Sequence, residues 1–315
     1  MQQFENSNQS FSSGVVIPML TPVTTSGELD EPAVERLIEH IIQGGVRGIF
    51  VLGTTGEAAS IPPRMKKRLV EKTVERVMGR VQVYAGISDN SFSTAVEAAK
   101  SFSSLGADIV VAHLPICYEL NASEQEYYFR VLSETIKVPL MIYNIPSTTR
   151  MSIPVEVISR LSRIPTIVGM KDSQGDINRI TEIIEAVEDR SKFAILTGST
   201  AQSYKSLELG CDGIVPSLGN IVPGICQSLY DAFLQGDATE ALLCQSQLDQ
   251  LSLFMRNGLS LGQSLAAHKT LLSALQICDP SVLLPLIDLP EDKQNSIKAT
   301  FLEWLPTTEK EQTIR

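Results

Sequence analysis

The sequence lacks the features that mark secreted and membrane-bound proteins. Its five cysteines are widely spaced and none forms a Cys-x-x-Cys pair, a pattern typical of buried thiols in a reducing compartment. No apolar run approaches the roughly 20 residues that a membrane helix needs. Residues 1–13 are polar and have neither the basic nor the apolar region of a secretory signal. We therefore expect a cytoplasmic protein with a flexible arm at residues 1–13 and no membrane as a partner.

Signals for nucleic-acid and metal binding are also missing. The formal net charge is −10, and lysine and arginine are scattered without a basic run, which argues against nucleic acid as a partner. His40, His113 and His268 stand on three separate segments, and no Asp/Glu pair has metal-ligand spacing at a predicted strand end. Neither a phosphate-loop motif nor a nucleophile elbow occurs. We expect no metal and no organic cofactor.

The chain alternates between short apolar runs and longer stretches of helical period. Eight strands are predicted, at residues 15–20, 48–52, 81–87, 108–114, 139–143, 166–171, 193–197 and 213–215. Each precedes a predicted helix, at residues 32–43, 62–78, 92–105, 123–136, 154–161, 177–187, 201–209 and 222–234. Strands that are apolar on both faces belong in a parallel sheet covered by helices, so the repeat predicts an α/β protein.

Eight strand–helix units close into a (β/α)8, or TIM, barrel, which typically takes roughly 250 residues. The chain has 315 residues, so we assign 14–235 to the barrel and 236–315 to a C-terminal helical extension. Three helices are predicted in that extension, at residues 239–255, 262–275 and 291–302. The alternative architecture is an open doubly wound sheet. It would need a glycine-rich turn after the first strand, and the chain has Leu-Thr-Pro-Val at residues 20–23 instead.

One lysine, Lys171, ends the sixth predicted strand and is followed by a polar turn. It can simply reach into solvent, as most lysines do. Alternatively it lies in a dry site, where burial disfavours the charged form of an amine. A free lysine amine has a pKa of about 10.4, so almost none of it is nucleophilic at neutral pH. A neutral amine, in contrast, attacks a ketone and forms a Schiff base.

Other strand ends carry hydroxyls and glycines, and in a barrel these ends meet at the face where active sites lie. The turn at residues 53–57 reads Gly-Thr-Thr-Gly-Glu and can hold a carboxylate by several N–H and O–H donors, or it can be an ordinary helix-capping turn. Tyr143 ends strand five and can relay a proton or be a half-buried core residue. Gly198 follows strand seven, and Val215 ends strand eight.

Three of these motifs together resemble the dihydrodipicolinate synthase / N-acetylneuraminate lyase family. They are Gly-Thr-Thr-Gly-Glu at residues 53–57, Tyr-Asn-Ile-Pro at residues 143–146 and Gly-Met-Lys-Asp-Ser at residues 169–173. The likeness extends from about Val15 to Leu302. The resemblance implies a class I, Schiff-base aldolase on a (β/α)8 barrel, without a cofactor, assembled as a homotetramer built of dimers.

The resemblance also implies a role for each matching residue. Lys171 would form the imine with pyruvate or another 2-oxo acid, and Tyr143 would move protons to and from the imine and the aldol oxygen. Thr54 and Thr55 would hold the carboxylate of the 2-oxo acid and connect to the tyrosine, so they count as both catalytic and substrate-binding. The expected substrate-binding residues also include Gly53, Thr148, Gly198 and Val215.

Two loops depart from the family pattern. In dihydrodipicolinate synthases an arginine after Asn-x-Pro-Ser binds the carboxylate of the second substrate, but the matching residue here is Thr148, and Arg150 lies two residues further on. A second tyrosine, reached across a subunit interface, should follow strand four. The loop at residues 115–119 is shifted from the usual Pro-Tyr-Tyr, and Tyr118 is its candidate catalytic residue.

The small polar loop at residues 147–149 favours cleavage or formation of a C–C bond in a 2-keto-3-deoxy sugar acid or a 4-hydroxy-2-oxo acid, with pyruvate and an aldehyde as small-molecule partners. The alternative is 4-hydroxy-tetrahydrodipicolinate (dihydrodipicolinate) synthase, which condenses pyruvate with aspartate semialdehyde. A Schiff-base dehydratase is a third alternative. A hypothesis of another class is a catalytically silent barrel that binds a 2-oxo acid, and the shifted Tyr118 loop is its only support.

Overall fold

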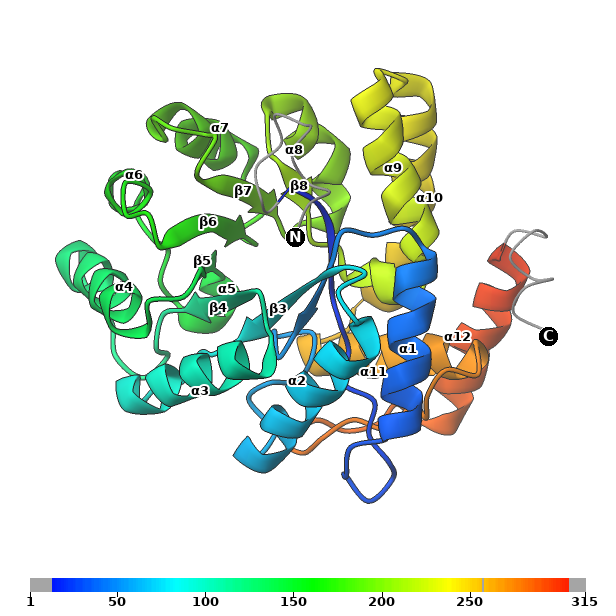
Figure 1. Cartoon of the computed structure of the whole chain (residues 1–315). Coiled ribbons are helices and arrows are strands. Elements are labelled where there is room, and N and C mark those ends of the chain that lie inside the picture. Colours follow the sequence, from blue (N-terminus) through cyan, green and yellow to red (C-terminus); the bar gives the residue numbers. More distant parts are fainter. Residues whose placement is uncertain (1–12, 257, 306–315) are drawn as a thin grey trace.

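The computed structural model of the chain describes residues 13–256 and 258–305 (Figure 1). Its eight strands form a closed parallel barrel in the order of the chain, and β1 pairs with both β2 and β8. The strands are β1 (Gly14–Pro18), β2 (Gly48–Val51), β3 (Gln82–Gly86), β4 (Ile109–His113), β5 (Leu140–Asn144), β6 (Ile167–Asp172), β7 (Ala194–Thr197) and β8 (Gly213–Ile214). Every predicted strand overlaps an observed one, and the predicted α/β fold, a (β/α)8 barrel, is confirmed.

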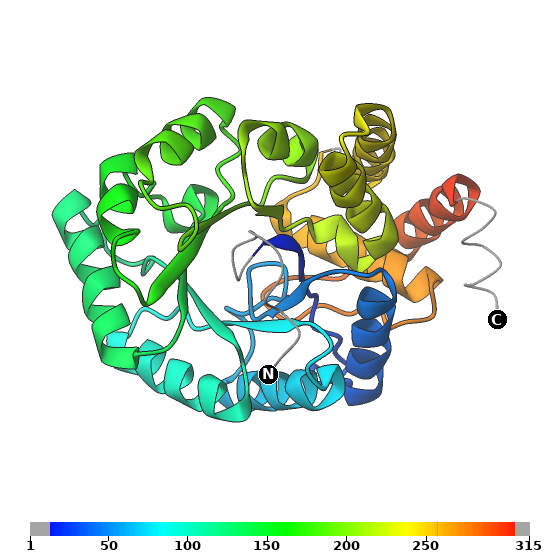
Figure 2. The ribbon, with the colours of Figure 1, turned by 45° about the horizontal axis from the view of Figure 1, so that its top comes forward.

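Helices surround the barrel on its outside (Figure 1, Figure 2). The barrel helices are α1 (Glu31–Gln43), α2 (Pro63–Val77), α3 (Phe92–Leu105), α4 (Ala122–Ile136), α6 (Val155–Leu161), α7 (Ile177–Ala186), α8 (Ser203–Leu209) and α9 (Pro223–Gln235). On α1 the buried stripe includes Val34, Leu37, Ile38 and Ile41, the positions that its helical period predicts. Burial of such a stripe against the sheet holds each helix in place.

A second apolar cluster fills the inside of the barrel. Its buried members are Val16, Phe50, Tyr84, Ile109, Val111, Met141, Tyr143, Ile145, Leu196 and Val215. Because successive side chains of a strand point to opposite faces, Tyr143 faces this cluster and Asn144 faces the helices. On β6 the same alternation turns Lys171 inward and Asp172 outward.

Local structure differs from the sequence-based expectation after three strands. The Ser-Thr-Thr loop after β5 forms a short helix, α5 (Pro146–Thr149), because proline at its first position is already set for a helix. The start of the helix predicted at 201–209 is the separate 3-10 turn η1 (Thr200–Gln202). A second 3-10 turn, η2 (Ser217–Asn220), follows β8, and Val215 lies just beyond the end of that strand.

The three predicted C-terminal helices are present as α10 (Ala238–Arg256), α11 (Leu261–Ala274) and α12 (Glu291–Trp304). Helix α10 packs along α9, and α11 contacts η2, on the side of the barrel where α1 and α9 close the ring (Figure 2). The Arg36 guanidinium on α1 donates to the carbonyl of Ile277 (2.9 Å). The division between barrel and extension at residue 235 stays a prediction. The predicted arm lies outside the described residues, except for Ser13, which is buried.

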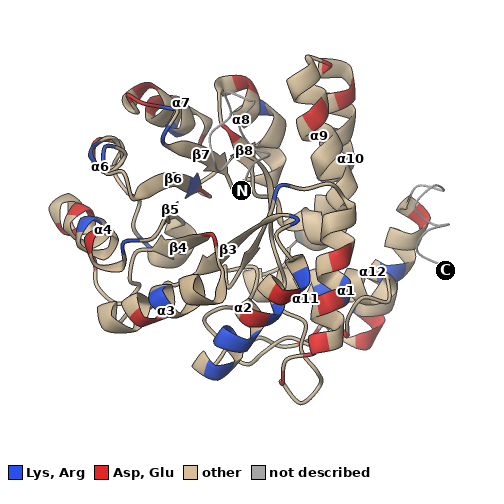
Figure 3. Cartoon of the chain, in the orientation of Figure 1, with Lys and Arg blue, Asp and Glu red and all other residues tan. Residues whose placement is uncertain are grey.

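Charged residues of both signs lie side by side on the outer faces of α1 and α2 (Figure 3). Ion pairs along this row include Glu31–Arg68, Glu35–Lys72 and Glu39–Arg76 between the helices, and Glu28–Arg64 and Glu39–Arg80 at their ends. Partly exposed pairs contribute about 0–1 kcal/mol each, so this row adds little to stability beyond the apolar packing underneath. Within the described residues, no helix is both long and apolar enough to cross a membrane.

Candidate active site

Lys171 lies inside the barrel, near the carboxyl ends of the strands, and only 5% of its surface is exposed. In the parallel pairing of β5 with β6 it stands opposite Tyr143. Its Nζ is 4.3 Å from the centre of the Tyr143 ring, and no ion pair joins Lys171 to another residue of the described chain. Of the two interpretations of this lysine, the structure supports the buried one.

Phe50 connects the lysine to the turn that follows β2. Nζ of Lys171 is 5.1 Å from the centre of the Phe50 ring, and this ring packs edge-on against Tyr143 with centres 6.3 Å apart. The same ring also contacts Gly53, where a β-carbon would lie 2.9 Å from Cε1 of Phe50. Glycine at this position therefore lets the Gly-Thr-Thr-Gly-Glu turn rest on the ring that contacts the lysine.

Three hydroxyls that were predicted to act in the site have no hydrogen-bond partner within the described chain. They belong to Thr54, Thr55 and Tyr143. The two threonines are half-buried and Tyr143 is buried. Polar groups of proteins are usually paired, so unpaired hydroxyls at the edge of a buried site are positioned to meet a ligand or water. The catalytic roles of these three residues stay predictions.

A buried polar network behind β5 and β6 holds the Tyr143–Lys171 pair in register. Asp172, 1% exposed, accepts hydrogen bonds from the Asn144 amide (2.8 Å) and from the Arg179 guanidinium on α7 (3.0 Å). Asn144 follows Tyr143 in the chain, and Asp172 follows Lys171. The network on the outer face therefore fixes the two residues that face inward.

Two of the expected substrate-binding residues, Gly198 and Val215, lie beside this pair. A β-carbon at Gly198 would be 2.9 Å from Cε of Lys171, and the Gly198 N–H donates to the Asp172 carbonyl (2.6 Å). The same β-carbon would lie 2.0 Å from Oγ of Ser173, so a larger residue here would displace Ser173 as well as Lys171. Val215 is 3% exposed and belongs to the inner cluster that contains Tyr143.

His113 is a neighbour of the site that sequence reasoning missed. It ends β4 opposite Tyr143, and the two rings pack edge-on with centres 6.2 Å apart. Burial lowers the pKa of His113, and a hydrogen bond with the Leu114 carbonyl opposes this shift. A lowered pKa favours the neutral imidazole at pH 7. The sequence feature that could have indicated this location was the position of His113 near the end of the fourth predicted strand.

Thr148 lies on α5, directly after β5, and is half-buried. Its N–H donates to the Ile145 carbonyl (3.0 Å). Arg150 is exposed and has a left-handed backbone with φ of 61°. In the described chain no side-chain hydrogen bond or ion pair joins Arg150 to the residues around Lys171. This segment therefore presents a hydroxyl, and no guanidinium, next to the strand that carries Tyr143.

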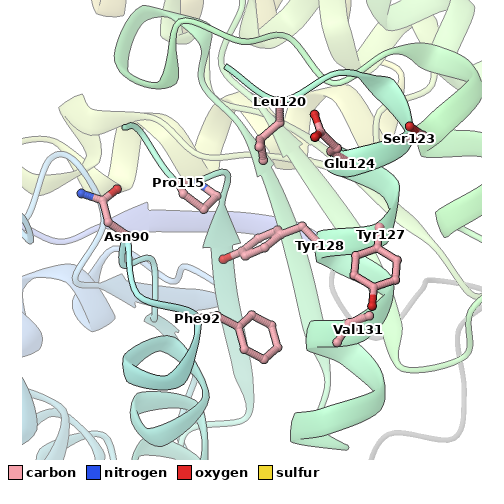
Figure 4. Close-up of a pocket in the computed structure, with 9 residues that line it drawn as sticks. All are labelled: Asn90, Phe92, Pro115, Leu120, Ser123, Glu124, Tyr127, Tyr128 and Val131. Atoms are coloured by element: carbon pink, nitrogen blue, oxygen red, sulfur yellow. The ribbon is translucent and has the colours of Figure 1, made fainter. Parts of the chain in front are cut away.

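Tyr118 lies apart from the lysine within one chain. It belongs to the loop after β4 and is 71% exposed, and its neighbour Ile116 is 48% exposed. A cavity of about 650 Å³ lies beside this loop, between α3 and α4 (Figure 4). Its lining is largely apolar: Asn90, Phe92, Pro115, Leu120, Ser123, Glu124, Tyr127, Tyr128 and Val131. The role of Tyr118 across a subunit interface stays a prediction.

A closed (β/α)8 barrel with a buried lysine beside a tyrosine on adjacent strands defines a class of enzymes, the Schiff-base carbon–carbon lyases and synthases. The chain belongs to the dihydrodipicolinate synthetase family, whose sequence profile matches residues 11–303. The family that the three strand-end motifs predicted is therefore confirmed.

Relatives of this chain are similar over almost their whole length. The 4-hydroxy-tetrahydrodipicolinate synthase of Protochlamydia amoebophila is 30% identical over 94% of this chain and 97% of that protein. The enzyme of the same name from Hyphomonas neptunium is 32% identical over 86% and 91%. The solved dihydrodipicolinate synthase of Bacteroides thetaiotaomicron matches with a TM-score of 0.88 and 30% identity, covering 92% of this chain and 98% of that one. These names favour the synthase alternative over the sugar-acid lyase that the loop residues favoured.

Replacing Arg179 with methionine should strongly destabilise the fold. Arg179→Met leaves the buried Asp172 carboxylate without its cation, and breaking a buried pair in this way typically costs about 3–5 kcal/mol. We expect a loss of that size in the free energy of unfolding, measured with urea at pH 7. Arg163→Met, which breaks an exposed pair with Glu188, is the control and should lose no more than about 1 kcal/mol. Equally small losses in both variants would contradict the role of the network.

Proposed function

We propose that this enzyme binds pyruvate as an imine on Lys171 and uses the imine to form or break a carbon–carbon bond. The observation that carries the proposal is the buried Lys171 amine, 4.3 Å from the centre of the Tyr143 ring and without an ion pair in the described chain. A lysine that apolar side chains shield from water can act as a nucleophile toward a ketone.

The chemistry follows from the charge of the imine. The amine attacks the C2 carbonyl carbon of pyruvate, and the carbonyl oxygen leaves as water. The protonated imine draws electrons from C3 and stabilises the enamine that forms when C3 loses a proton. The enamine attacks the carbonyl carbon of an aldehyde, and the aldehyde oxygen takes up a proton. Tyr143, whose ring lies against the amine, is the proposed carrier of these protons.

The turn at residues 53–57 is the proposed site for the carboxylate of pyruvate. Thr54 and Thr55 offer two unpaired hydroxyls, and hydrogen bonds to a carboxylate are about twice as strong as those between neutral groups. Because Gly53 rests on the Phe50 ring that Lys171 also contacts, a carboxylate bound here would bring its ketone carbon toward the amine. Gly198 and Val215 would line the rest of the pocket.

Aspartate semialdehyde is our first candidate for the aldehyde. The relatives at 30% and 32% identity bear the name 4-hydroxy-tetrahydrodipicolinate synthase, which supports this assignment. After the carbon–carbon bond has formed, the amino group of the former aldehyde can attack C2 and displace Lys171 from the imine. This step closes a six-membered ring and regenerates the free amine.

A 4-hydroxy-2-oxo acid or 2-keto-3-deoxy sugar acid is the second candidate, and Thr148 is the observation that favours it. A hydroxyl next to β5 suits a polyhydroxylated chain, whereas a second carboxylate is bound best by a guanidinium fork. The reaction would then be the reverse aldol cleavage, which releases an aldehyde and leaves the enamine of pyruvate on Lys171.

Self-association is proposed as well, with Tyr118 acting in the site of a neighbouring subunit. The exposed side chains of Ile116 and Tyr118, together with the apolar cavity between α3 and α4, form a surface of the kind that proteins use for contact with one another. A homotetramer built of dimers is the proposed assembly. In it, the Tyr118 hydroxyl would extend the proton relay of the partner's tyrosine.

Borohydride reduction in the presence of pyruvate tests the imine. The reagent should add the mass of a reduced pyruvyl group to the peptide that contains Lys171, as detected by mass spectrometry, and inactivate the enzyme. Lys171→Ala should abolish the adduct, because no other lysine lies beside Tyr143 in the described chain. Lys192→Ala, at an exposed lysine, is the control and should label like the wild type. Absence of an adduct on wild-type protein would refute the proposed function.

Two assays distinguish the candidate reactions. If the synthase assignment holds, pyruvate consumption should require aspartate semialdehyde, and Thr148→Arg should lower the KM for the aldehyde by about tenfold, as expected for a charge-assisted bond worth about 1.5–3 kcal/mol. A panel of 4-hydroxy-2-oxo acids and 2-keto-3-deoxy acids should then release little pyruvate. Fast pyruvate release from the panel, with no turnover of aspartate semialdehyde, would establish the second candidate instead.

Subunit mixing tests Tyr118. Tyr118→Phe removes one hydroxyl from the proposed relay and should lower kcat by about 100-fold, the lower end for general acid–base catalysis. When this variant is mixed with inactive Lys171→Ala subunits, activity should return, because a mixed dimer holds one site with both groups. Full activity of Tyr118→Phe alone would show that the residue has no role. A low activity that mixing does not rescue would place Tyr118 in its own chain's site.

A further inference from the structure

A second lysine, Lys269, is buried more deeply than Lys171. It lies on α11 in the C-terminal extension, and its Nζ is 2.5 Å from Oε1 of Glu57; both side chains are 0% exposed. The same Nζ donates to the Ser281 carbonyl (2.7 Å), and Oε2 of Glu57 accepts from the Leu283 N–H (2.7 Å). Both partners of the Glu57 carboxylate therefore come from the extension, far from it in the sequence.

Glu57 is the last residue of the Gly-Thr-Thr-Gly-Glu turn. Its backbone is left-handed, with φ of 57°, a conformation that a residue with a side chain keeps only when surrounding contacts hold it. Its N–H donates to the Thr54 carbonyl (3.1 Å). Through this hydrogen bond, the position of Glu57 affects the position of the Thr54 backbone.

The other parts of the turn are pressed against the barrel. The Gly56 carbonyl accepts a hydrogen bond from the Thr21 hydroxyl (2.7 Å), and a β-carbon on Gly56 would lie 2.9 Å from the Met19 carbonyl oxygen. Gly53 rests on Phe50. The barrel therefore fixes the turn up to Gly56, and α11 fixes its last residue through a charged contact.

We propose that Lys269 is a positioning residue for Thr54 and Thr55 and acts through Glu57. The proposal rests on the proposed function of the turn as the site for the 2-oxo acid carboxylate. An apolar pair of similar volume would fill the same space without the desolvation that two buried charges require. An apolar side chain at residue 57, however, would have no carboxylate to bridge residue 269 and the Leu283 N–H. The structure thus makes the C-terminal extension part of the active site's construction.

Carboxylate preference in the full-length enzyme tests this inference. Borohydride trapping on Lys171 is measured with pyruvate and with methyl pyruvate, which keeps the ketone but lacks the anionic carboxylate. The wild type should prefer pyruvate. In Lys269→Met this preference should fall by at least about tenfold, because displaced threonines no longer meet the carboxylate. The double variant Glu57→Gln/Lys269→Met should lose about as much as the worse single variant, because both residues act through one contact.

Hydrogen exchange supplies a readout that does not depend on chemistry. The amides of residues 53–57 should exchange at least about tenfold faster in Lys269→Met than in the wild type. Arg190→Gln is the matched control, since it breaks the partly buried pair with Asp212 near the opposite end of the barrel. This control should lose thermal stability without a change in carboxylate preference or in exchange at residues 53–57.

The outcomes separate the two proposals. Unchanged preference in a Lys269→Met enzyme that still traps pyruvate, or unchanged exchange at residues 53–57, would overturn the role of Lys269 even if stability falls. If the wild type forms no adduct on Lys171, the proposed function fails, and the exchange measurement alone decides on Lys269. If Lys269→Met does not fold, Glu57→Gln, which keeps an acceptor for Leu283, provides the same two measurements.

Discussion

Tyr143 and Lys171 face each other across the pairing of β5 with β6, and this register sets the geometry of the site. A shift of β6 by one residue would turn Lys171 out of the barrel and leave Tyr143 without its neighbour, because side chains alternate along a strand. The shift would also bring Asp172 into the apolar interior and separate its carboxylate from Asn144 and Arg179. The same network therefore excludes the wrong register and stabilises the right one.

The interior of the barrel makes this pair chemically useful. The lysine amine lies between the rings of Phe50 and Tyr143, and Gly198 leaves space along its side chain. These two rings shield the amine from water. The turn at residues 53–57 adds polar donors at one edge of these apolar surroundings, and it is the proposed site for the anionic group of the substrate.

Most of the barrel was predictable from the sequence because its elements are local and periodic. Strands with apolar residues on both faces and helices with one apolar stripe, such as α1, are visible within a short window. Lys171, Tyr143 and the threonine turn were predictable because polar residues stood where buried strands end. Helix α5 was missed, since four residues are too few to show a helical period.

Contacts between distant segments were not predictable in the same way. Glu57 and Leu283 are 226 residues apart in the sequence. Lys269 lies in α11, where every residue from Leu265 to Leu272 is buried. Nothing in a local pattern distinguishes that lysine from a solvent-exposed one. Phe50 was missed for a related reason. An aromatic residue in a buried strand predicts only a core position, which Phe50 does occupy. Its importance comes from its contacts with Lys171, Tyr143 and Gly53, which only the structure shows.

The division between strands and loops also bears on the substrate. In the proposed reaction, residues on the strands bind and activate the 2-oxo acid, and relatives with about 30% identity over nearly the whole chain belong to the same family. The proposed aldehyde would meet the loops, where Thr148 lies on α5 and Arg150 is exposed. A synthase with this segment has to hold the second carboxylate by neutral donors, and such bonds are about half as strong as those from a guanidinium. In the proposed function, the loop after β5, rather than the lysine, therefore distinguishes the two candidate second substrates.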